Sequence, residues 1–390
     1  MENQDFFKNL VVDKQITREL NFNPYYRIFE SRLKDPVVIE GKEFINLASN
    51  NYLGLAGDPR VIDAIKNGAD NYGASLCGTP IATGYADIFK KCERLLADFI
   101  GLEDAVLFPS CYQANNEVLT NLVSKDDLVL IDHFAHASLI SGIRQTGCRI
   151  RPFLHNDMKN LEKHLAQQDK YKRIFVITES VFSTEGSIAP LNDIIHLCEK
   201  YGAIPFIDDS HGIGVIGKNG RGILEKKGVT HFNGIYTASL GKAIANAGGM
   251  VAGNRELIDY IRYSVPGLIY STALPPVIIA GIIKVLEIIC TEFSVISNRM
   301  WKYKKMIQSA LTRAGFTLSQ GDAPITSVVC GSTHETIFFA KKLFQRNIIT
   351  TPFIPPSVPS GQGRVRIIAG ANLRKDSIEK VVLVLMRMAG

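Results

Sequence analysis

Short apolar runs alternate with amphipathic, helix-like segments along most of this chain, and this alternation constrains the fold more than any other feature. The runs carry almost no polar residues, as is typical of strands that are covered on both faces. They span residues 105–108, 128–131, 174–178, 204–207, 235–237 and 250–252. The helix-like segments span 86–100, 113–123, 161–167 and 191–201. The pattern predicts an α/β fold in which helices wrap a mostly parallel central sheet.

The two ends of the chain have a different pattern. Residues 1–50 read as an N-terminal arm with a short β element near 37–45, and residues 51–290 hold the alternating pattern of a large domain. Residues 291–390 predict a smaller C-terminal α+β domain. Its expected elements are helices at 301–314 and 335–345, strands at 327–329 and 364–369, a Pro/Gly-rich loop at 352–363 and a last helix.

Composition excludes several classes of protein. The formal net charge of the 390 residues is +6, with no concentrated basic run among aromatics, so we do not expect a nucleic-acid partner. The seven cysteines are scattered without CxxC spacing, which is typical of reduced thiols in the cytoplasm. The first residues lack the order of a signal peptide. The apolar stretch 275–289 is interrupted by Lys284 and is too short to cross a bilayer, which favours a buried helix.

The sequence Ser239-Leu240-Gly241-Lys242 directly follows an apolar run. The end of a strand in an α/β fold is where such folds bind ligands. The segment after the lysine is rich in small residues and nearly uncharged, as suits a partly buried site. Burial lowers the pKa of a lysine and makes its amine available for Schiff-base chemistry. A surface lysine in a loop is the alternative interpretation.

The sequence Asp208-Asp209-Ser210-His211 follows the apolar run 204–207. A carboxylate at this place can pair with a protonated pyridine nitrogen and keep a heteroaromatic ring ready to accept electrons. His211 could bind another substituent of such a ring. Alternatively, one of the aspartates caps a turn. A metal site is less favoured, because the usual two-histidine helical spacing is absent.

Two further turns follow strands. Between His133 and His136 the chain could place an imidazole over a planar ring, although a metal site or an ordinary polar loop stays open. Ser110-Cys111-Tyr112 stands between a strand and a helix, where free backbone N–H groups and the positive end of the helix dipole bind phosphate. An ordinary helix start would look the same.

Arg364 and Arg366 lie two residues apart on a late strand, so their guanidinium groups share one face. One of them could hold a carboxylate in bidentate fashion, whereas a solvated pair is the alternative. The run 212–217 matches the glycine pattern G-x-G-x-x-G of dinucleotide sites. Turn-forming residues follow it, whereas a dinucleotide fingerprint opens a helix, so nicotinamide binding is not expected.

Taken in order, these motifs resemble the α-oxoamine synthase family of fold-type-I pyridoxal-phosphate (PLP) enzymes. The resemblance runs from about residue 23 to the C-terminus. It rests on NNYLGL, the turn SCY, AHASL, TESVFSTEG, DDSHGIGVIG, SLGK, IYSTALPP and PPSVPSG followed by RVR. One such motif is weak evidence, but eight in the family's order are specific.

The resemblance implies catalytic roles for four residues. Lys242 carries PLP as a Schiff base and later moves a proton. Asp208 pairs with the pyridine nitrogen, His211 contacts the ring hydroxyl, and His136 stacks on the ring. The resemblance implies no metal.

The resemblance also implies which residues bind the cofactor and the substrate. The phosphate is surrounded by Ser110, Cys111, Tyr112 and Ser239, with Thr272 reaching it from a second subunit. Ser183 borders both cofactor and substrate, and the substrate side is formed by Asn50, Arg27, Ser357 and Arg366. Shared sites of this kind imply a homodimer.

The implied reaction is a decarboxylative condensation of a small amino acid with an acyl thioester, giving an α-amino ketone. Glycine, alanine and serine stay open as the amino acid, and coenzyme A and a carrier protein stay open as the thiol. An aminotransferase and a non-catalytic partner subunit are the alternatives. This chain departs from the family at Phe89, where a histidine is usual, and lacks an arginine that is common around 73–79. Both departures concern the acyl-donor side.

Overall fold

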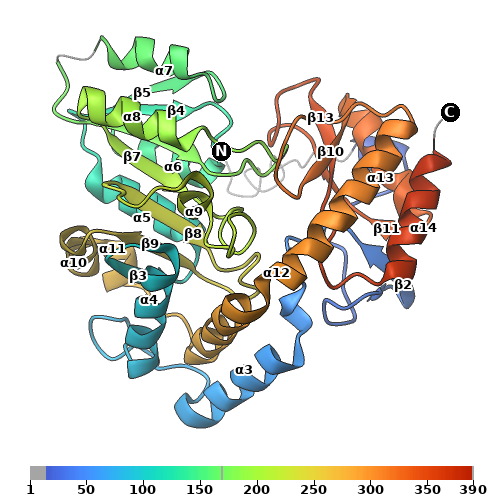
Figure 1. The fold of residues 1–390 in the computed structure, drawn as a ribbon, viewed down its shortest axis with the longest axis horizontal. Coiled ribbons are helices and arrows are strands. Elements are labelled where there is room, and N and C mark those ends of the chain that lie inside the picture. The colour runs from blue at the N-terminus through green and yellow to red at the C-terminus, as the bar shows by residue number, and fades with distance from the viewer. Residues whose placement is uncertain (1–14, 168–169, 389–390) are drawn as a thin grey trace, which may run out of the picture.

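The computed structural model describes residues 15–167 and 170–388; the first fourteen residues of the expected arm lie outside this range. Its centre is a seven-stranded sheet in the order β3-β9-β8-β7-β6-β4-β5 (Figure 1). Strand β9 is antiparallel to both of its neighbours, and the other pairs are parallel, which confirms the predicted mostly parallel sheet. The strands are β3 (Asp104–Phe108), β4 (Leu128–Asp132), β5 (Arg149–Phe153), β6 (Ile174–Glu179), β7 (Ile204–Asp208), β8 (Ile235–Ser239) and β9 (Gly249–Gly253).

Side chains of the central strands alternate between two faces, and each face packs into its own core. On β4, Val129 and Ile131 join one buried cluster, whereas Leu128 and Leu130 join another. This is the period-two pattern of a strand, and the first four residues of β4 are all apolar because helices cover both faces. The apolar runs in the sequence therefore mark the interior of the sheet.

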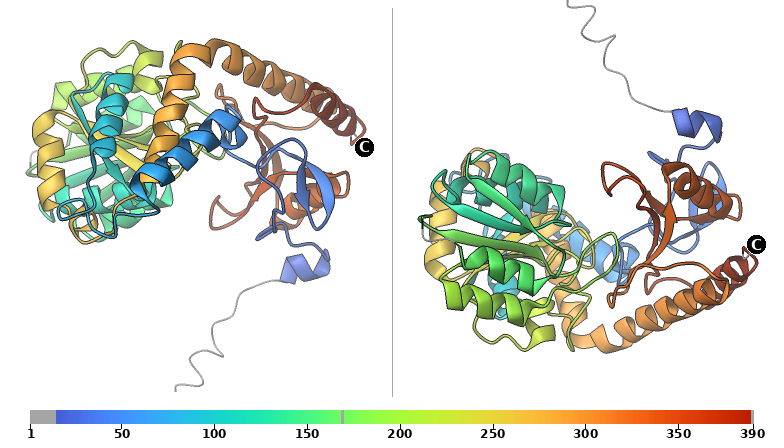
Figure 2. Two further views of the ribbon diagram at one scale, coloured as in Figure 1. Left: turned by 90° about the horizontal axis from the view of Figure 1, so that it is seen from below. Right: turned by 90° about the horizontal axis from the view of Figure 1, so that it is seen from above.

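Helices cover both faces of the central sheet (Figures 1 and 2). One face packs against α5 (Cys111–Leu122), α6 (Ala137–Arg144), α10 (Arg255–Ser264) and α11 (Pro266–Ile269). The other face packs against α4 (Asp87–Ile100), α7 (Met158–Leu165), α8 (Leu191–Tyr201), α9 (Ile223–Lys227) and the first half of α12 (Pro276–Arg313). Helix α3 (Pro59–Tyr72) lies along α12, and the 3₁₀ turn η1 (Leu55–Gly57) precedes it.

Helix α12 is 38 residues long and contributes to two cores. Ile279 and Ile282 are buried with the central sheet, whereas Ile307 and Leu311 are buried in a second core with α13 (Thr333–Phe344) and α14 (Lys375–Met386). The predicted helices at 275–289 and 301–314 are thus one continuous helix. It runs through residues 290 and 291, where the expected boundary between the two domains falls.

Two three-stranded sheets accompany the second core. One has the order β10-β13-β12, and the other has the order β1-β2-β11. Helix α2 (Gln15–Glu19) packs on α13 at the same end of the molecule. The strands are β1 (Val37–Ile39), β2 (Lys42–Asn46), β10 (Thr326–Gly331), β11 (Ile348–Ile349), β12 (Thr351–Phe353) and β13 (Gly363–Ile367). None of the described helices combines the length and hydropathy that a bilayer-crossing segment needs.

Candidate active site

Two adjoining cavities lie at the carboxyl ends of the parallel strands. The first, here called the sheet cavity, has a volume of about 390 Å³ and is formed by β6, β7, the β3–α5 turn and the β8–β9 loop. The second, here called the arginine cavity, has a volume of about 560 Å³ and also includes β13 and the loop after β12. His136, Glu179 and Lys242 line both. The two cavities therefore meet at one amine, one imidazole and one carboxyl group.

Asp208 is the last residue of β7 and lies buried in the sheet cavity. One of its carboxylate oxygens accepts a hydrogen bond of 2.7 Å from Asn115 Nδ2, and the other accepts one of 2.9 Å from the backbone N–H of Ser210. Asn115 is itself held by Thr237, whose hydroxyl donates to Asn115 Oδ1 over 2.7 Å. This chain of hydrogen bonds fixes the carboxylate in one orientation.

Lys242 follows β8 in the loop that leads to β9, and its amine lines both cavities. Burial lowers the pKa of Lys242, and the nearby Asp208 carboxylate acts in the opposite direction. A lowered pKa increases the fraction of neutral amine, which is the form that attacks a carbonyl carbon.

His136 precedes α6 and is oriented by its own helix start. Its Nδ1 accepts a hydrogen bond of 3.2 Å from the backbone N–H of Ser138. In the neutral ring the proton is therefore assigned to Nε2. Burial lowers the pKa of His136, which favours the neutral ring. Among the described residues, no three His, Cys, Asp or Glu side chains are grouped so that they could hold a metal ion.

Glu179 is a site residue that the sequence reasoning did not single out. It ends β6 next to Asp208 in register and lines both cavities. Burial raises the pKa of Glu179 well above its ordinary value, and the charge of Asp208 raises it further. The rule that selected Asp208, a carboxyl group at the end of an apolar strand, applies equally to Glu179 and would have found it.

His211 lies buried at the inner wall of the arginine cavity. Its Nδ1 is 2.8 Å from the hydroxyl of Tyr52, whose ring is fully buried. Burial lowers the pKa of His211 well below its ordinary value, and the positive charge of Lys242 adds to this effect. Tyr52 fixes the orientation of His211, and no feature of the sequence alone connects residues that are 159 positions apart.

The turn between β3 and α5 forms one end of the sheet cavity. Ser110 caps α5 by accepting a hydrogen bond of 3.1 Å from the N–H of Gln113, and Tyr112 is half exposed. The first N–H groups of a helix lack intrahelical partners, so this end offers donors for an anion. Ser239 and Gly248 line the same cavity from the opposite side.

Both arginines of β13 line the arginine cavity, as their alternation predicts. Arg366 lies over the ring of Phe353 at 4.9 Å, and its Nη1 donates a hydrogen bond of 3.0 Å to the carbonyl oxygen of Ser183. Arg364 donates to Glu185 over 3.2 Å. Arg364 already has a carboxylate partner, whereas Arg366 has only a carbonyl.

Two polar atoms in the arginine cavity are buried without any partner. They are Nε of Arg366 and Oδ1 of Asn50. Buried polar atoms are normally hydrogen-bonded, so an unpaired donor and an unpaired acceptor in one cavity point to a bound polar ligand. A donor on a guanidinium group suits a carboxylate, and an amide oxygen suits an amine or a hydroxyl.

The residues of the sheet cavity fit pyridoxal phosphate. A carboxylate for the pyridine nitrogen, an amine for the aldehyde, an imidazole for the ring face and a helix start for the phosphate all line this one cavity; they are Asp208, Lys242, His136 and the turn at Ser110. The cavity adjoins the unpaired atoms of Arg366 and Asn50, which gives a substrate amino acid a place beside the ring.

All the predicted site residues except Arg27 and Thr272 line one of the two cavities. Arg27 instead forms an ion pair of 3.1 Å with Glu40, and its guanidinium lies 4.4 Å over the ring of Phe344. Both partners belong to the second core region, so this chain's Arg27 is not brought to its own arginine cavity. Thr272 is exposed.

The glycine run 212–217 is a loop and opens no helix, in agreement with its interpretation as turn chemistry. The loop from Gly212 to Gly222 wraps around the buried side chain of Asp209. A Cβ atom at Gly212 or Gly222 would lie within 2 Å of a carboxylate oxygen of Asp209, so these positions require glycine. The carboxylate accepts hydrogen bonds from the Tyr236 hydroxyl at 2.7 Å and the Ile223 N–H at 3.0 Å.

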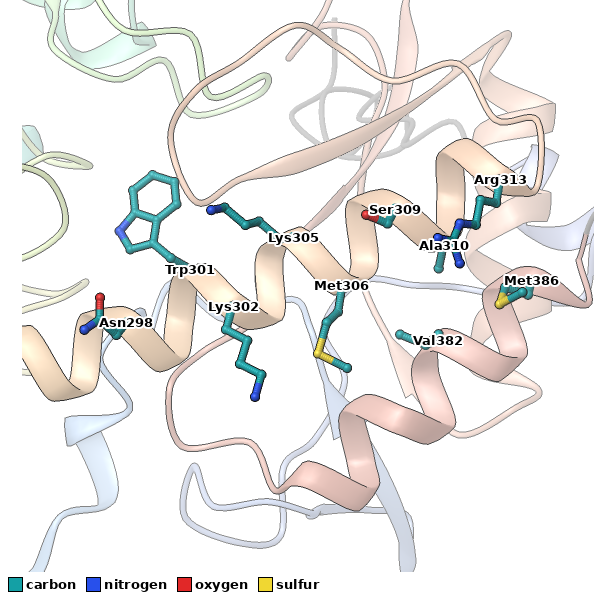
Figure 3. A pocket seen from close by; sticks show the side chains of 10 residues that line it. All are labelled: Asn298, Trp301, Lys302, Lys305, Met306, Ser309, Ala310, Arg313, Val382 and Met386. Carbon is teal, nitrogen blue, oxygen red and sulfur yellow. The ribbon is translucent and has the colours of Figure 1, made fainter.

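Two further cavities share no residue with the site. One, of about 600 Å³, includes Phe89, which is buried and lies 5.5 Å from Tyr85 between ring centroids. The other is a groove of about 580 Å³ between α12 and α14, lined by Trp301, Lys305 and Met386 among others (Figure 3). The usual family histidine is thus replaced here by the ring of Phe89, in a cavity of mixed apolar and charged residues outside the two site cavities.

Comparison with known proteins agrees with this site. Residues 42–385 match the family model for aminotransferase class I and II. An 8-amino-7-oxononanoate synthase of Alkaliphilus metalliredigens (strain QYMF) is 35% identical over 381 residues, covering 96% of both chains. A 2-amino-3-ketobutyrate coenzyme A ligase of Escherichia coli (strain K12) is 35% identical over 382 residues, covering 97% of this chain and 96% of the relative.

Solved structures give the same result. A serine palmitoyltransferase from S. paucimobilis with bound PLP-myriocin aldimine superimposes with a TM-score of 0.93 and 26% identity, covering 99% of this chain and 98% of that chain. An 8-amino-7-oxononanoate synthase from Francisella tularensis superimposes with a TM-score of 0.76 and 27% identity, covering 88% and 97%. With the cavity residues described above, these matches show that the chain belongs to the α-oxoamine synthase family of PLP-dependent acyltransferases.

Proposed function

We propose that this enzyme joins a small amino acid to an acyl thioester and releases carbon dioxide and a thiol, with Lys242 as the group that binds the cofactor and moves the α-proton. The observation that carries the proposal is the shared position of Lys242 in both cavities, between Asp208 and Arg366. An amine at this junction reaches a cofactor on one side and a substrate α-carbon on the other.

The overall reaction balances without an oxidant or reductant. The α-carbon loses a proton, forms a carbon–carbon bond to the acyl carbonyl carbon, and the thiolate leaves. The carboxylate is then lost as carbon dioxide, a proton returns to the α-carbon, and an α-amino ketone is the product. PLP, when bound, supplies a ring that accepts the electron pair left on the α-carbon.

The chain's own residues orient the substrate and handle the protons. Arg366 offers its unpaired Nε to the substrate carboxylate, and Asn50 offers an amide oxygen to a polar substrate group. The Lys242 amine takes the α-proton, aided by the lowered pKa that burial gives it. Glu179, whose pKa burial raises, can hold a proton at the junction of the cavities.

The test of this function combines absorbance with product analysis. The protein loaded with PLP should show the visible absorption of a lysine Schiff base, and Lys242→Ala should lose both this absorption and the turnover. Pairs of amino acids and acyl thioesters should then be assayed for free thiol and for the mass of the product. An active pair should release thiol and form an α-amino ketone. Conversion of the cofactor to its pyridoxamine form by an amino acid alone would instead establish an aminotransferase.

We also propose that the enzyme is a homodimer in the cytoplasm, with Thr272 of one subunit completing the phosphate site of the other. Thr272, Tyr112 and Tyr270 are exposed side chains, and Tyr270 is 83% exposed, which is unusual for a large ring on a single chain. All seven cysteines are free thiols, as suits a reducing compartment. Light scattering should give twice the mass of one chain, and Tyr270→Glu should shift the mass towards one chain.

A further inference from the structure

A line of three polar side chains runs beside the arginine cavity. His155 Nδ1 is 3.1 Å from a carboxylate oxygen of Asp132, and His155 Nε2 is 2.9 Å from the hydroxyl of Ser187. Asp132 ends β4, His155 follows β5, and Ser187 lies in the turn after β6. Neither His155 nor Ser187 lines the sheet cavity or the arginine cavity, so Ser187 is not placed as a nucleophile.

The protons along this line are fixed by the partners of Asp132. The carboxylate also accepts hydrogen bonds from the backbone N–H groups of Phe134 at 2.9 Å and Asn156 at 3.0 Å. Because Asp132 only accepts, His155 Nδ1 carries a proton. In the neutral ring Nε2 then accepts from the Ser187 hydroxyl at 2.9 Å and, over a longer 3.3 Å, from Asn156 Nδ2. Every atom of the line has a partner, and the imidazole has one orientation.

Aromatic rings hold the His155 ring on two sides. The ring of Phe134 lies 4.7 Å away and is tilted by 30°, and the ring of Phe182 meets it edge-on at 4.3 Å. Phe134 lines the arginine cavity, whereas Phe182 is buried at the start of the turn that contains Ser187. His155 is therefore a rigid connection between the central sheet and this turn.

The turn, here called the 181–188 hairpin, is closed by a bridge between Val181 and Ile188. Its backbone receives hydrogen bonds from the region of the second core. Arg366 donates to the carbonyl of Ser183 over 3.0 Å, and Ser327 donates to the carbonyl of Thr184 over 2.6 Å. The hairpin thus holds the guanidinium group that the proposed function assigns to the substrate carboxylate.

We infer that His155 is a positioning residue for amino-acid binding: through Ser187 it sets the 181–188 hairpin, and the hairpin sets Arg366. This inference rests on the proposed function, in which Arg366 binds the substrate carboxylate. It assigns a task to residues that touch neither cofactor nor substrate. The effect should fall mainly on amino-acid binding, because the connection ends at Arg366, to which Ser183 contributes its backbone carbonyl.

Two variants separate the connection from the packing. His155→Asn places an amide nitrogen near the former Nδ1 and keeps the contact with Asp132, but it is too short to reach Ser187. Ser187→Ala removes only the outer hydrogen bond and leaves the rings in place. Each variant should weaken amino-acid binding by up to about tenfold, the upper end for one lost hydrogen bond between neutral groups. The double variant should be no weaker than either single one.

The measurements distinguish positioning from general damage. The dissociation constant of the amino acid is read from the visible spectrum of the PLP-loaded protein, alongside the KM for each substrate. The amino-acid constants should rise, while the acyl-thioester KM, the PLP affinity and the melting temperature stay near the wild-type values. In the cofactor-free protein, amide exchange of residues 180–189 should become faster. His231→Ala, which removes an exposed histidine elsewhere, is the matched control.

Either of two results overturns the inference. Unchanged amino-acid binding in both single variants would refute the connection. If both variants weakened amino-acid binding and PLP binding and raised the thioester KM to the same extent, His155 would serve general stability alone. If the wild-type protein binds PLP and amino acids but releases no thiol, the proposed condensation fails, while the spectral binding constants still decide the role of His155.

Discussion

Asp208 and Asp209 are neighbours in the chain, yet their surroundings give the two carboxyl groups different tasks. Asp208 opens into the sheet cavity, where Asn115 orients it. Asp209 is fully buried behind the sheet, where burial raises its pKa to about 7. The first carboxylate serves the cofactor site, and the second organises the loop from Gly212 to Gly222.

The raised pKa of Asp209 makes its contribution to stability depend on pH. Its ordinary value is 3.8, so the folded state holds a proton that the unfolded state releases between about pH 4 and pH 7. Stability from this group is therefore complete at about pH 4 and is lost as the pH rises through 7. Asp209→Asn has no such loss, because the amide does not titrate. The difference in melting temperature, Asp209→Asn minus wild type, should therefore increase from pH 5 to pH 8.

Thermal melts of both proteins across this pH range measure the difference. Asp193→Asn, which removes an exposed carboxylate from α8, is the control and should follow the wild-type profile. A constant difference between Asp209→Asn and wild type at all pH values would contradict the raised pKa of Asp209.

Single residues were predictable from the sequence where a simple position rule applied. Asp208, His136 and Lys242 each follow an apolar run, and the carboxyl ends of parallel strands meet at one edge of the sheet. Tyr52 and Asn115 occupy no such position, because their roles come from partners far away in the sequence. Tyr52 is hydrogen-bonded to His211, and Asn115 is hydrogen-bonded to Asp208.

At the scale of elements, the start of α5 presses closely on β9. A Cβ atom at Gly249 would lie 2.4 Å from the backbone N and Cα of Cys111, the first residue of α5. This close approach holds the helix start against the cavity where the phosphate is expected. The fold therefore uses a glycine, rather than a side-chain contact, to set the position of the anion-binding end.

Gly249→Ala should push the start of α5 away from β9 and weaken PLP binding by at least about tenfold, since the backbone atoms of Cys111 lie too close to Gly249 to leave room for a Cβ atom. Titration of the cofactor-free protein with PLP, followed by absorbance, measures the affinity. Gly253→Ala at the other end of β9 meets the flexible tip of Leu257 at 2.8 Å and serves as the control. It should lower the melting temperature but keep the PLP affinity; a parallel loss in both variants would contradict the local explanation.

Elements were predictable where burial is complete on both sides. The six apolar runs are strands β3, β4, β6, β7, β8 and β9. Strand β5 escaped prediction because it lies at the edge of the sheet, where Arg149 and Pro152 are exposed and the apolar signal is lost. The continuity of α12 was also missed, since its surface pattern changes where it passes from one core to the other.

At the scale of the whole molecule, α12 is the main covalent and packed link between the central sheet and the second core (Figures 1 and 2). The arginine cavity is built from both sides of this link: Lys242 and His136 come from the sheet side, and Arg366 comes from β13. The cavity depends on tertiary packing across the molecule, so its composition could not be predicted from local patterns. The alternation of the late strand predicted that Arg364 or Arg366 could hold a carboxylate, and the family resemblance chose Arg366 and added Ser357.

A break in the middle of α12 should therefore impair the amino-acid site more than the cofactor site. Val295 is 74% exposed, so Val295→Pro changes no core packing but removes a helix hydrogen bond, at a cost of about 3 kcal/mol. The expected result is a raised KM for the amino acid together with a lowered melting temperature, while PLP still produces its visible band. Val295→Ala, which keeps the helix intact, should behave as wild type.

Steady-state kinetics, PLP absorbance and thermal melts of the two Val295 variants give the comparison. A proline variant whose amino-acid KM equals that of the alanine variant would show that the two sides of the arginine cavity keep their arrangement without a continuous α12.

The glycine-rich loop around Asp209 has a consequence for protein engineering. A nucleotide-binding loop curls its backbone around an anion that arrives with the ligand, whereas this loop already encloses a carboxyl group that is covalently part of the chain. Redesigning residues 212–217 for a dinucleotide would place a phosphate in the space that the Asp209 carboxyl group already fills. A designer who trusts the spacing of the glycines would first have to remove the resident carboxylate, and with it the support of the loop.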